Sequence, residues 1–275
     1  ENINLDSLDY HSAQHIHYVV EAERRVYADR AEFLGDIDYV PVPIDTLISD
    51  NYANHRWSSV DSFYATSSVN IKHGEVFFDY NESEETTHYS VVDKWGNAVS
   101  VTTTINGWFG NGIVVDRAGF LLNNEMDDFS SKTGEPNAYG LIGNAANAIE
   151  PGKRMLSSMS PTIVEDPNGK LFLVVGSPGG STIITTTAQV IMNVIDFGMG
   201  IEDAVESPRF HHQWLPDFLQ LEKYSVSIET IIELKKRGHE IYYRESIGEA
   251  NCIQLKNGLI YGASDSRRNS SAIGY

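Results

Sequence analysis

The abrupt change of pattern at residue 86 constrains the fold of this chain more than any other feature of its sequence. Residues 81–85, "NESEE", are polar, and three of the five are acidic. The next segments, "THYSVVD" at 87–93 and "NAVSVTTTI" at 97–105, alternate between apolar and polar side chains, with turn residues in "KWGN" between them. A period of two is typical of half-buried strands. The pattern therefore predicts an antiparallel hairpin that begins at the doubled threonine Thr86-Thr87.

Patterns elsewhere in the chain combine helices with further hairpins. Helical spacing or length predicts helices within 7–36, 181–198 and 227–238, the last capped by Ser227 and stopped by Gly238. For the second segment, the length and the apolar stripe favour a helix; the stripe consists of Ile184, Ala188, Ile191, Val194 and Ile195. Hairpins are predicted over 160–180 and on the Asn-Gly turn of 251–264, and short strands at 112–115 and 119–124. This order favours an α+β fold with an antiparallel sheet.

The remaining segments are less regular. Residues 36–85 are expected to form a connector with one or two short helices, and residues 130–153 a long loop rich in glycine, proline and asparagine. A loop of that length in a compact domain is usually a lid or a binding loop.

Composition excludes several classes of function. The chain of 275 residues has 38 acidic and 20 basic residues, a formal charge of −18, so binding to nucleic acid or to an anionic membrane is not expected. No apolar run is long enough to span a bilayer. Cys252 is the only cysteine, and neither His15 with His17 nor His211 with His212 has a metal-binding spacing, so no metal is predicted. The absence of an initiating Met and of a signal pattern suggests a fragment or a processed product.

The segment "GSPGG" at 176–180 lies between an apolar strand pattern and a helix pattern. Bare N–H groups of Gly179 and Gly180 beside a helix N-terminus would suit an oxyanion hole. A phosphate-binding loop would need a lysine, and Thr182 stands near its place. A plain tight turn explains the pattern equally well, so the residues alone leave this alternative open.

Two polar clusters could bind charged groups. The segment "NNEMDDF" at 123–129 could hold a cation or an ammonium group, and "KRMLSSMSPT" at 153–162 could bind a carboxylate. Read alone, the first is better explained as a solvated loop and the second as a serine-rich turn. Neither a nucleophile elbow nor a Cys-His pair in a known context is present.

Taken together, the order of these segments resembles that of the bacterial γ-glutamyltranspeptidases, which are N-terminal-nucleophile hydrolases made as self-cleaving precursors. The resemblance runs through "TTHYSVVDKWGNAVSVTTTIN", "GFLLNNEMDDFS", "KRMLSSMSPTIV" and "GSPGGSTIITT". Residues 86–275 look like a complete small, catalytic subunit, and residues 1–85 resemble the C-terminal part of a large subunit, more loosely over 36–85. The resemblance implies a four-layer αββα sandwich, incomplete if the upstream segment is needed for it.

By this resemblance the chain is cut between Glu85 and Thr86, and Thr86 is the nucleophile. A free α-amine, with a pKa of roughly 7.7–8.0, can take the proton of the hydroxyl on the same residue, whereas an internal threonine has only an amide nitrogen. The resemblance implies that Thr104 orients the Thr86 hydroxyl and that Gly179 and Gly180 stabilise the oxyanion.

The resemblance also implies a pocket for the γ-glutamyl head group. Its ammonium would be held by Asp128 and Glu125 with Asn106, and its carboxylate by Ser157 and Ser158 with help from Arg154. The loop around Tyr139 looks like a lid over this pocket. Two positions depart from the family pattern: Met155 replaces a frequent proline and Thr182 a frequent arginine.

The implied reaction is γ-glutamyl transfer from glutathione and other γ-glutamyl amides to Thr86 and then to water, an amino acid or a peptide. No cofactor is expected. The family's missing upstream segment, which supplies a carboxylate-binding arginine, would be a partner, and its absence puts the fragment's own activity and self-cleavage in question. The family implies a periplasmic or secreted location. A related acylase or poly-γ-glutamate-processing enzyme, and a non-catalytic scaffold with this fold, remain alternatives.

Overall fold

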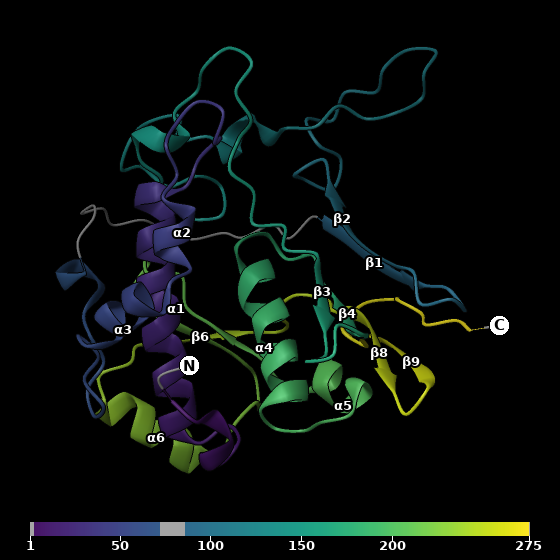
Figure 1. Cartoon of the computed structure of the whole chain (residues 1–275). Coiled ribbons are helices and arrows are strands. Elements are labelled where there is room, and N and C mark those ends of the chain that lie inside the picture. The colour runs from purple at the N-terminus through teal and green to yellow at the C-terminus, as the bar shows by residue number, and fades with distance from the viewer. Residues whose placement is uncertain (1–2, 72–85, 275) are drawn as a thin grey trace. The chain divides into compact units, whose positions relative to one another are not determined.

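The computed structural model describes residues 3–71 and 86–274, which form two compact units (Figure 1). Unit 1 comprises Glu1–Glu82, Glu125–Ser157 and Phe210–Arg244, and unit 2 comprises Ser83–Asn124, Ser158–Arg209 and Glu245–Tyr275. The chain passes between the units several times, so they are not the two predicted subunits. The subunit boundary at residues 85 and 86 concerns cleavage of the chain and stays a prediction.

Unit 1 is built around the long helix α1 (Ala13–Phe33), which confirms the helix predicted near the N-terminus. Its N-cap is Ser12, whose side chain accepts a hydrogen bond from the His15 N–H at 3.2 Å. The predicted connector is confirmed over its described part, residues 36–71, where two short helices occur, α2 (Ile44–Leu47) and α3 (Asp50–Trp57). Residues 72–85 lie outside the described residues.

A three-stranded sheet completes unit 1 and departs from the expected antiparallel arrangement. Its strands, in the order β5 (Phe210–His211), β6 (Leu219–Glu222) and β7 (Ile241–Arg244), include the parallel pair β6–β7. Helix α6 (Ile228–Lys236) connects this pair, as a parallel crossover requires, and has the predicted Ser227 cap. The expectation of a wholly antiparallel sheet was wrong because β6 is buried throughout and shows no alternation.

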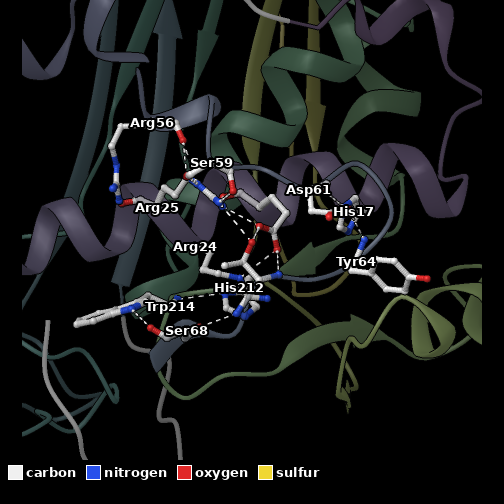
Figure 2. Close-up of polar contacts among 12 residues, drawn as sticks. His17, Arg24, Arg25, Arg56, Ser59, Asp61, Tyr64, Ser68, His212 and Trp214 are labelled. Carbon is white, nitrogen blue, oxygen red and sulfur yellow. Dashed lines mark hydrogen bonds and ion pairs between the residues drawn. The ribbon is translucent and has the colours of Figure 1, made fainter. Parts of the chain in front are cut away.

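Charged side chains of α1 hold the irregular segment 58–71 in place (Figure 2). The Arg25 guanidinium donates to the Ser59 hydroxyl and carbonyl at 3.0 and 2.9 Å. The Glu21 carboxylate accepts from the Thr66 N–H at 3.0 Å and from its hydroxyl at 2.6 Å. The Trp214 indole donates to the carbonyls of Ser68 and Ile71, both at 3.1 Å. Side chains thus form hydrogen bonds with backbone N–H and C=O groups of residues 58–71, which lie in no α-helix or β-strand.

Unit 2 consists of two sheets and a pair of helices. The hairpin β1 (Thr86–Val92) and β2 (Ala98–Thr104) is confirmed, and a second, four-stranded antiparallel sheet contains both later predicted hairpins. This sheet has the order β3 (Thr162–Glu165), β4 (Leu171–Val175), β8 (Asn251–Lys256), β9 (Leu259–Ser264). Helices α4 (Ile183–Ile195) and α5 (Ile201–Glu206) pack on one face of it through residues that include Val190, Val205 and Leu173. The α+β class is confirmed.

Two segments of unit 2 differ in detail from the sequence pattern. Helix α4 is confirmed, but Ala188 and Ile195 of the apolar stripe are exposed, and the buried face includes Thr185, Thr186 and Gln189. The short strands expected at 112–115 and 119–124 amount to a single bridge between Val114 and Leu121.

Candidate active site

The hairpin places Thr86 directly opposite Thr104 in the register of β1 and β2. Facing residues of an antiparallel pair have Cβ atoms about 4.5–5.5 Å apart, so the two side chains are neighbours on one face. The Thr104 hydroxyl accepts a hydrogen bond from the Asn106 N–H at 2.8 Å. Asn106 is buried, has a φ of 69°, and donates through Nδ2 to the Asn124 carbonyl at 3.2 Å. The structure thus brings Thr86, Thr104 and Asn106 to one end of the hairpin.

The glycine loop follows strand β4 and leads into α4. Gly179 and Gly180 have φ values of 136° and 53°, which favour glycine strongly. A Cβ on Gly179 would lie 2.5 Å from Thr182 Oγ1 and 3.2 Å from Gly248 Cα, so the space admits no side chain. The Gly179 carbonyl accepts from the Thr182 N–H and hydroxyl at 2.9 and 2.8 Å. Bare backbone at the start of a helix is the arrangement that an oxyanion hole requires.

His88 connects the hairpin to the glycine loop, and sequence reasoning did not single it out. It lies on the Thr86 face of β1, and a Cβ on Gly176 would come 2.3 Å from its Cε1 atom, so the ring lies directly against this glycine. Its two ring nitrogens pair with the hydroxyls of Thr102 and Ser90 at 2.9 and 3.1 Å. Burial lowers the pKa of His88 to about 4, so the ring is neutral. The only signal in the sequence was the alternation, which puts His88 on the same face as Thr86.

In unit 1, the acidic cluster is a 3-10 turn spanning Glu125–Asp128, not a fully solvated loop. Burial, with the charges of Glu125 and Asp127, raises the pKa of Asp128 to about 7, although Arg30 acts in the opposite direction. Burial also raises the pKa of Glu125. These shifts mean that the site stabilises the carboxylate charges poorly on its own, and a bound cation would offset that cost.

Two other predicted residues of unit 1 have defined surroundings. The Arg154 guanidinium forms ion pairs with Asp36 and Asp38, both at 2.5 Å, and its hydrogen bonds hold the pKa of Asp36 well below the usual range. Arg154 is therefore committed to carboxylates of its own chain, and nothing in these contacts supports its role toward a substrate. Tyr139 is buried, and its carbonyl accepts from Gln213 Nε2 at 3.0 Å.

The serine pair falls where the two units divide. Ser157, which is exposed, ends a segment of unit 1, and Ser158, which is half-buried, begins a segment of unit 2. The Ser158 carbonyl accepts from the Ser160 hydroxyl at 2.9 Å.

Histidines and acids in the described parts of the chain form no group of three or more that could hold a metal ion. His15 and His17 are buried in unit 1, and His17 pairs with His239 at 2.9 Å. The adjacent His211 and His212 have different partners, Gln213 at 2.8 Å and Asp217 at 3.4 Å.

Comparisons with known proteins agree with the sequence resemblance. A family model described as gamma-glutamyltranspeptidase matches residues 1–275. The glutathione hydrolase proenzyme of Escherichia coli K12 is 49% identical over 268 residues, which are 97% of this chain and 46% of that protein. The chain thus spans about half the length of the curated relatives it matches.

Solved structures agree on the fold. An acivicin-inhibited gamma-glutamyltranspeptidase, whose C-terminus is described as critical in autoprocessing and catalysis, shares 57% identity with a TM-score of 0.65 over 67% of this chain and 100% of that chain. A cephalosporin acylase from Bacillus halodurans, at 22% identity, has a TM-score of 0.76 over 99% of this chain and 48% of that chain. These matches confirm the predicted fold of the N-terminal-nucleophile hydrolases.

Proposed function

This chain belongs to the gamma-glutamyltranspeptidase family, and we propose that it catalyses γ-glutamyl transfer through an ester on Thr86. The observation that carries this proposal is that Thr86 of β1 faces Thr104 of β2, while the ring of His88, on the same face of β1, contacts the glycine loop. A break before Thr86 would leave the strand pairs from Thr87 to Val92 in place.

Activation would require cleavage between Glu85 and Thr86. The Thr86 hydroxyl attacks the Glu85 carbonyl, the peptide C–N bond breaks, and the nitrogen of Thr86 takes up the proton as the new α-amine. Water then hydrolyses the resulting ester and releases the carboxylate of Glu85. The relatives named glutathione hydrolase proenzyme and the autoprocessing described for a related structure support this step.

In turnover, the α-amine of Thr86 takes the hydroxyl proton as Oγ attacks the γ-amide carbonyl of the donor. The N–H groups of Gly179 and Gly180 would bind the oxyanion, and the loss of one such donor typically costs about 3 kcal/mol. The ammonium on Thr86 then gives its proton to the leaving amine as the C–N bond breaks. Water or an acceptor amine finally attacks the ester and regenerates the Thr86 hydroxyl.

The substrate class follows from the proposed head-group residues. Within unit 1, Asp128 and Glu125, whose raised pKa values favour a cationic partner, would hold the ammonium, and Ser157 would donate to the carboxylate. Glutathione, the substrate named for the relatives, carries both groups at its γ-glutamyl end. An acylase acting on groups without an ammonium would gain nothing from Asp128, which favours γ-glutamyl amides.

Kinetics with two chromogenic substrates test this proposal. Full-length protein should hydrolyse γ-glutamyl-p-nitroanilide far faster than glutaryl-p-nitroanilide, which lacks only the ammonium. Thr86→Ala should abolish both activities, whereas Thr87→Ala, a matched control on the exposed face of β1, should retain them. Preference for the glutaryl substrate would favour the acylase alternative, and no turnover by the wild type would favour the scaffold.

Location and partners are also proposals. No helix in the described residues is long and apolar enough to cross a membrane. A periplasmic or secreted location, and association with a further part of the large subunit, are inferred only from the family resemblance.

A further inference from the structure

The carboxamide of Asn147 is buried in unit 1 and has no role in the reaction described above. Asn147 ends the 3-10 turn Ala145–Asn147 in the long loop and is only 4% exposed. Its backbone is fixed on both sides: its N–H donates to the Asn144 carbonyl at 3.1 Å, and its carbonyl accepts from the Ser130 N–H at 2.9 Å. The side chain therefore starts from a well-defined position.

The two ends of this carboxamide bind the two segments that carry the proposed head-group residues. Nδ2 donates to the Asp128 carbonyl at 2.7 Å, and Oδ1 accepts from the Leu156 N–H at 3.0 Å. Asp128 is the proposed ammonium ligand, and Leu156 immediately precedes Ser157, a proposed carboxylate ligand. One buried side chain thus spans the gap between both segments within unit 1.

The chemistry of the substrate makes this gap important. The ammonium and the carboxylate of a γ-glutamyl group are attached to the same carbon, so the distance between them is fixed. A pocket that binds both at once must hold its two sides at a matching distance, and pre-organised groups bind without further loss of conformational freedom. A substrate with only one of the two groups has no such requirement.

We propose that Asn147 is a positioning residue that fixes the spacing between the ammonium side and the carboxylate side of the head-group pocket, an inference that rests on the function proposed above. It acts through Asp128 and Ser157 and does not touch the substrate, because its carboxamide is buried and bonded to backbone groups at both ends.

Asn147→Asp removes one of the two hydrogen bonds of the carboxamide and keeps the other. The variant is nearly isosteric and can still accept from the Leu156 N–H, but a carboxylate cannot donate to the Asp128 carbonyl and would repel it. Asn144→Ala is a matched control from the same loop. The Asn144 side chain donates to the Glu32 carboxylate and contacts neither head-group segment. This variant therefore perturbs the turn without removing either hydrogen bond of the Asn147 carboxamide.

The effect of the spacing is measured as kcat/KM for three anilides: γ-glutamyl-p-nitroanilide, glutaryl-p-nitroanilide, which lacks the ammonium, and 4-aminobutyryl-p-nitroanilide, which lacks the carboxylate. For Asn147→Asp in the full-length protein, we expect kcat/KM to fall about tenfold for the γ-glutamyl substrate and to change less than about twofold for the other two, the size expected for one lost buried hydrogen bond. Asn144→Ala should leave the ratios among the three substrates unchanged. A purely structural role would instead lower all three values in proportion, and that result would overturn the proposal.

Asn147→Ser provides a second test if Asn147→Asp does not fold, since its small hydroxyl leaves room for water in place of the carboxamide. It should show the same loss of selectivity, and unchanged ratios would refute the inference. Wild-type turnover distinguishes an error in the role of Asn147 from an error in the proposed function. If the wild type hydrolyses the γ-glutamyl anilide but neither variant alters the ratios, only the role of Asn147 is wrong; if the wild type is inactive, the proposed function fails with it.

Discussion

At the scale of the residue, the most informative group is the Asp128 carboxyl. Its pKa is raised to about 7 by burial and by the neighbouring Glu125 and Asp127. The charge of Asp128 therefore changes near neutral pH. The sequence predicted that Asp128 could bind an ammonium group, but it could not predict the pKa, since the burial arises only when the turn packs in unit 1.

This pKa predicts a pH dependence that is specific to the head group. Asp128 is ionised above pH 7 and protonated below it, so the attraction proposed between this carboxylate and the substrate ammonium is lost as the pH falls through 7. Titration of the Thr86 α-amine affects all substrates alike. The ratio of kcat/KM for γ-glutamyl-p-nitroanilide to that for glutaryl-p-nitroanilide should therefore be constant well above pH 7. Below pH 6 it should fall by up to about tenfold per pH unit. A ratio that stays flat from pH 5 to pH 8.5 would show that Asp128 does not bind the ammonium.

At the scale of the element, the His88 ring couples strand β1 to the glycine loop. The His88 ring is held by Thr102 and Ser90 and lies against Gly176, whose carbonyl accepts from the Asn251 N–H at 3.2 Å. The hairpin itself was predictable, because alternation and turn residues are local signals. The contact between His88 and Gly176 was not, because it joins segments that are far apart in the sequence.

Gly176→Ala should displace β1 from the glycine loop. The new Cβ would lie 2.3 Å from the His88 ring, and overpacking of this kind costs about 1–3 kcal/mol of stability. We expect a lower melting temperature and a reduced kcat with a smaller change in KM, because the proposed nucleophile and the proposed oxyanion donors lose their relative position. Thermal denaturation and steady-state kinetics on γ-glutamyl-p-nitroanilide measure both effects.

Two further variants keep this prediction specific. Gly200→Ala, where the nearest atom to a Cβ is 3.9 Å away, should be tolerated. In the double variant Gly176→Ala/His88→Ala the clash is removed, so the two stability losses should be less than additive. Additive losses would mean that the ring and the glycine are not coupled.

At the scale of the whole molecule, local signals predicted more of the fold than of the site. The Ser227 cap and the Asn-Gly turn at Asn257 belong to short stretches, and the elements next to them were largely correct. The β5–β6–β7 sheet was missed because its strands have only two to four residues and are joined by a parallel crossover. Arg154 and Asn147 acquire their partners only through long-range folding, so the sequence could suggest the candidate residues but not which bonds they use.

The proposed reaction requires that Thr86 becomes a chain terminus and then the nucleophile. Mass spectrometry of full-length wild type, Thr86→Ala and the control Thr87→Ala tests it most directly. We expect two pieces, the smaller beginning at Thr86, for the wild type, a single uncut chain for Thr86→Ala, and cleavage between Glu85 and Thr86 in the control. An uncut wild type, a cut at another bond, or normal cleavage of Thr86→Ala would contradict it.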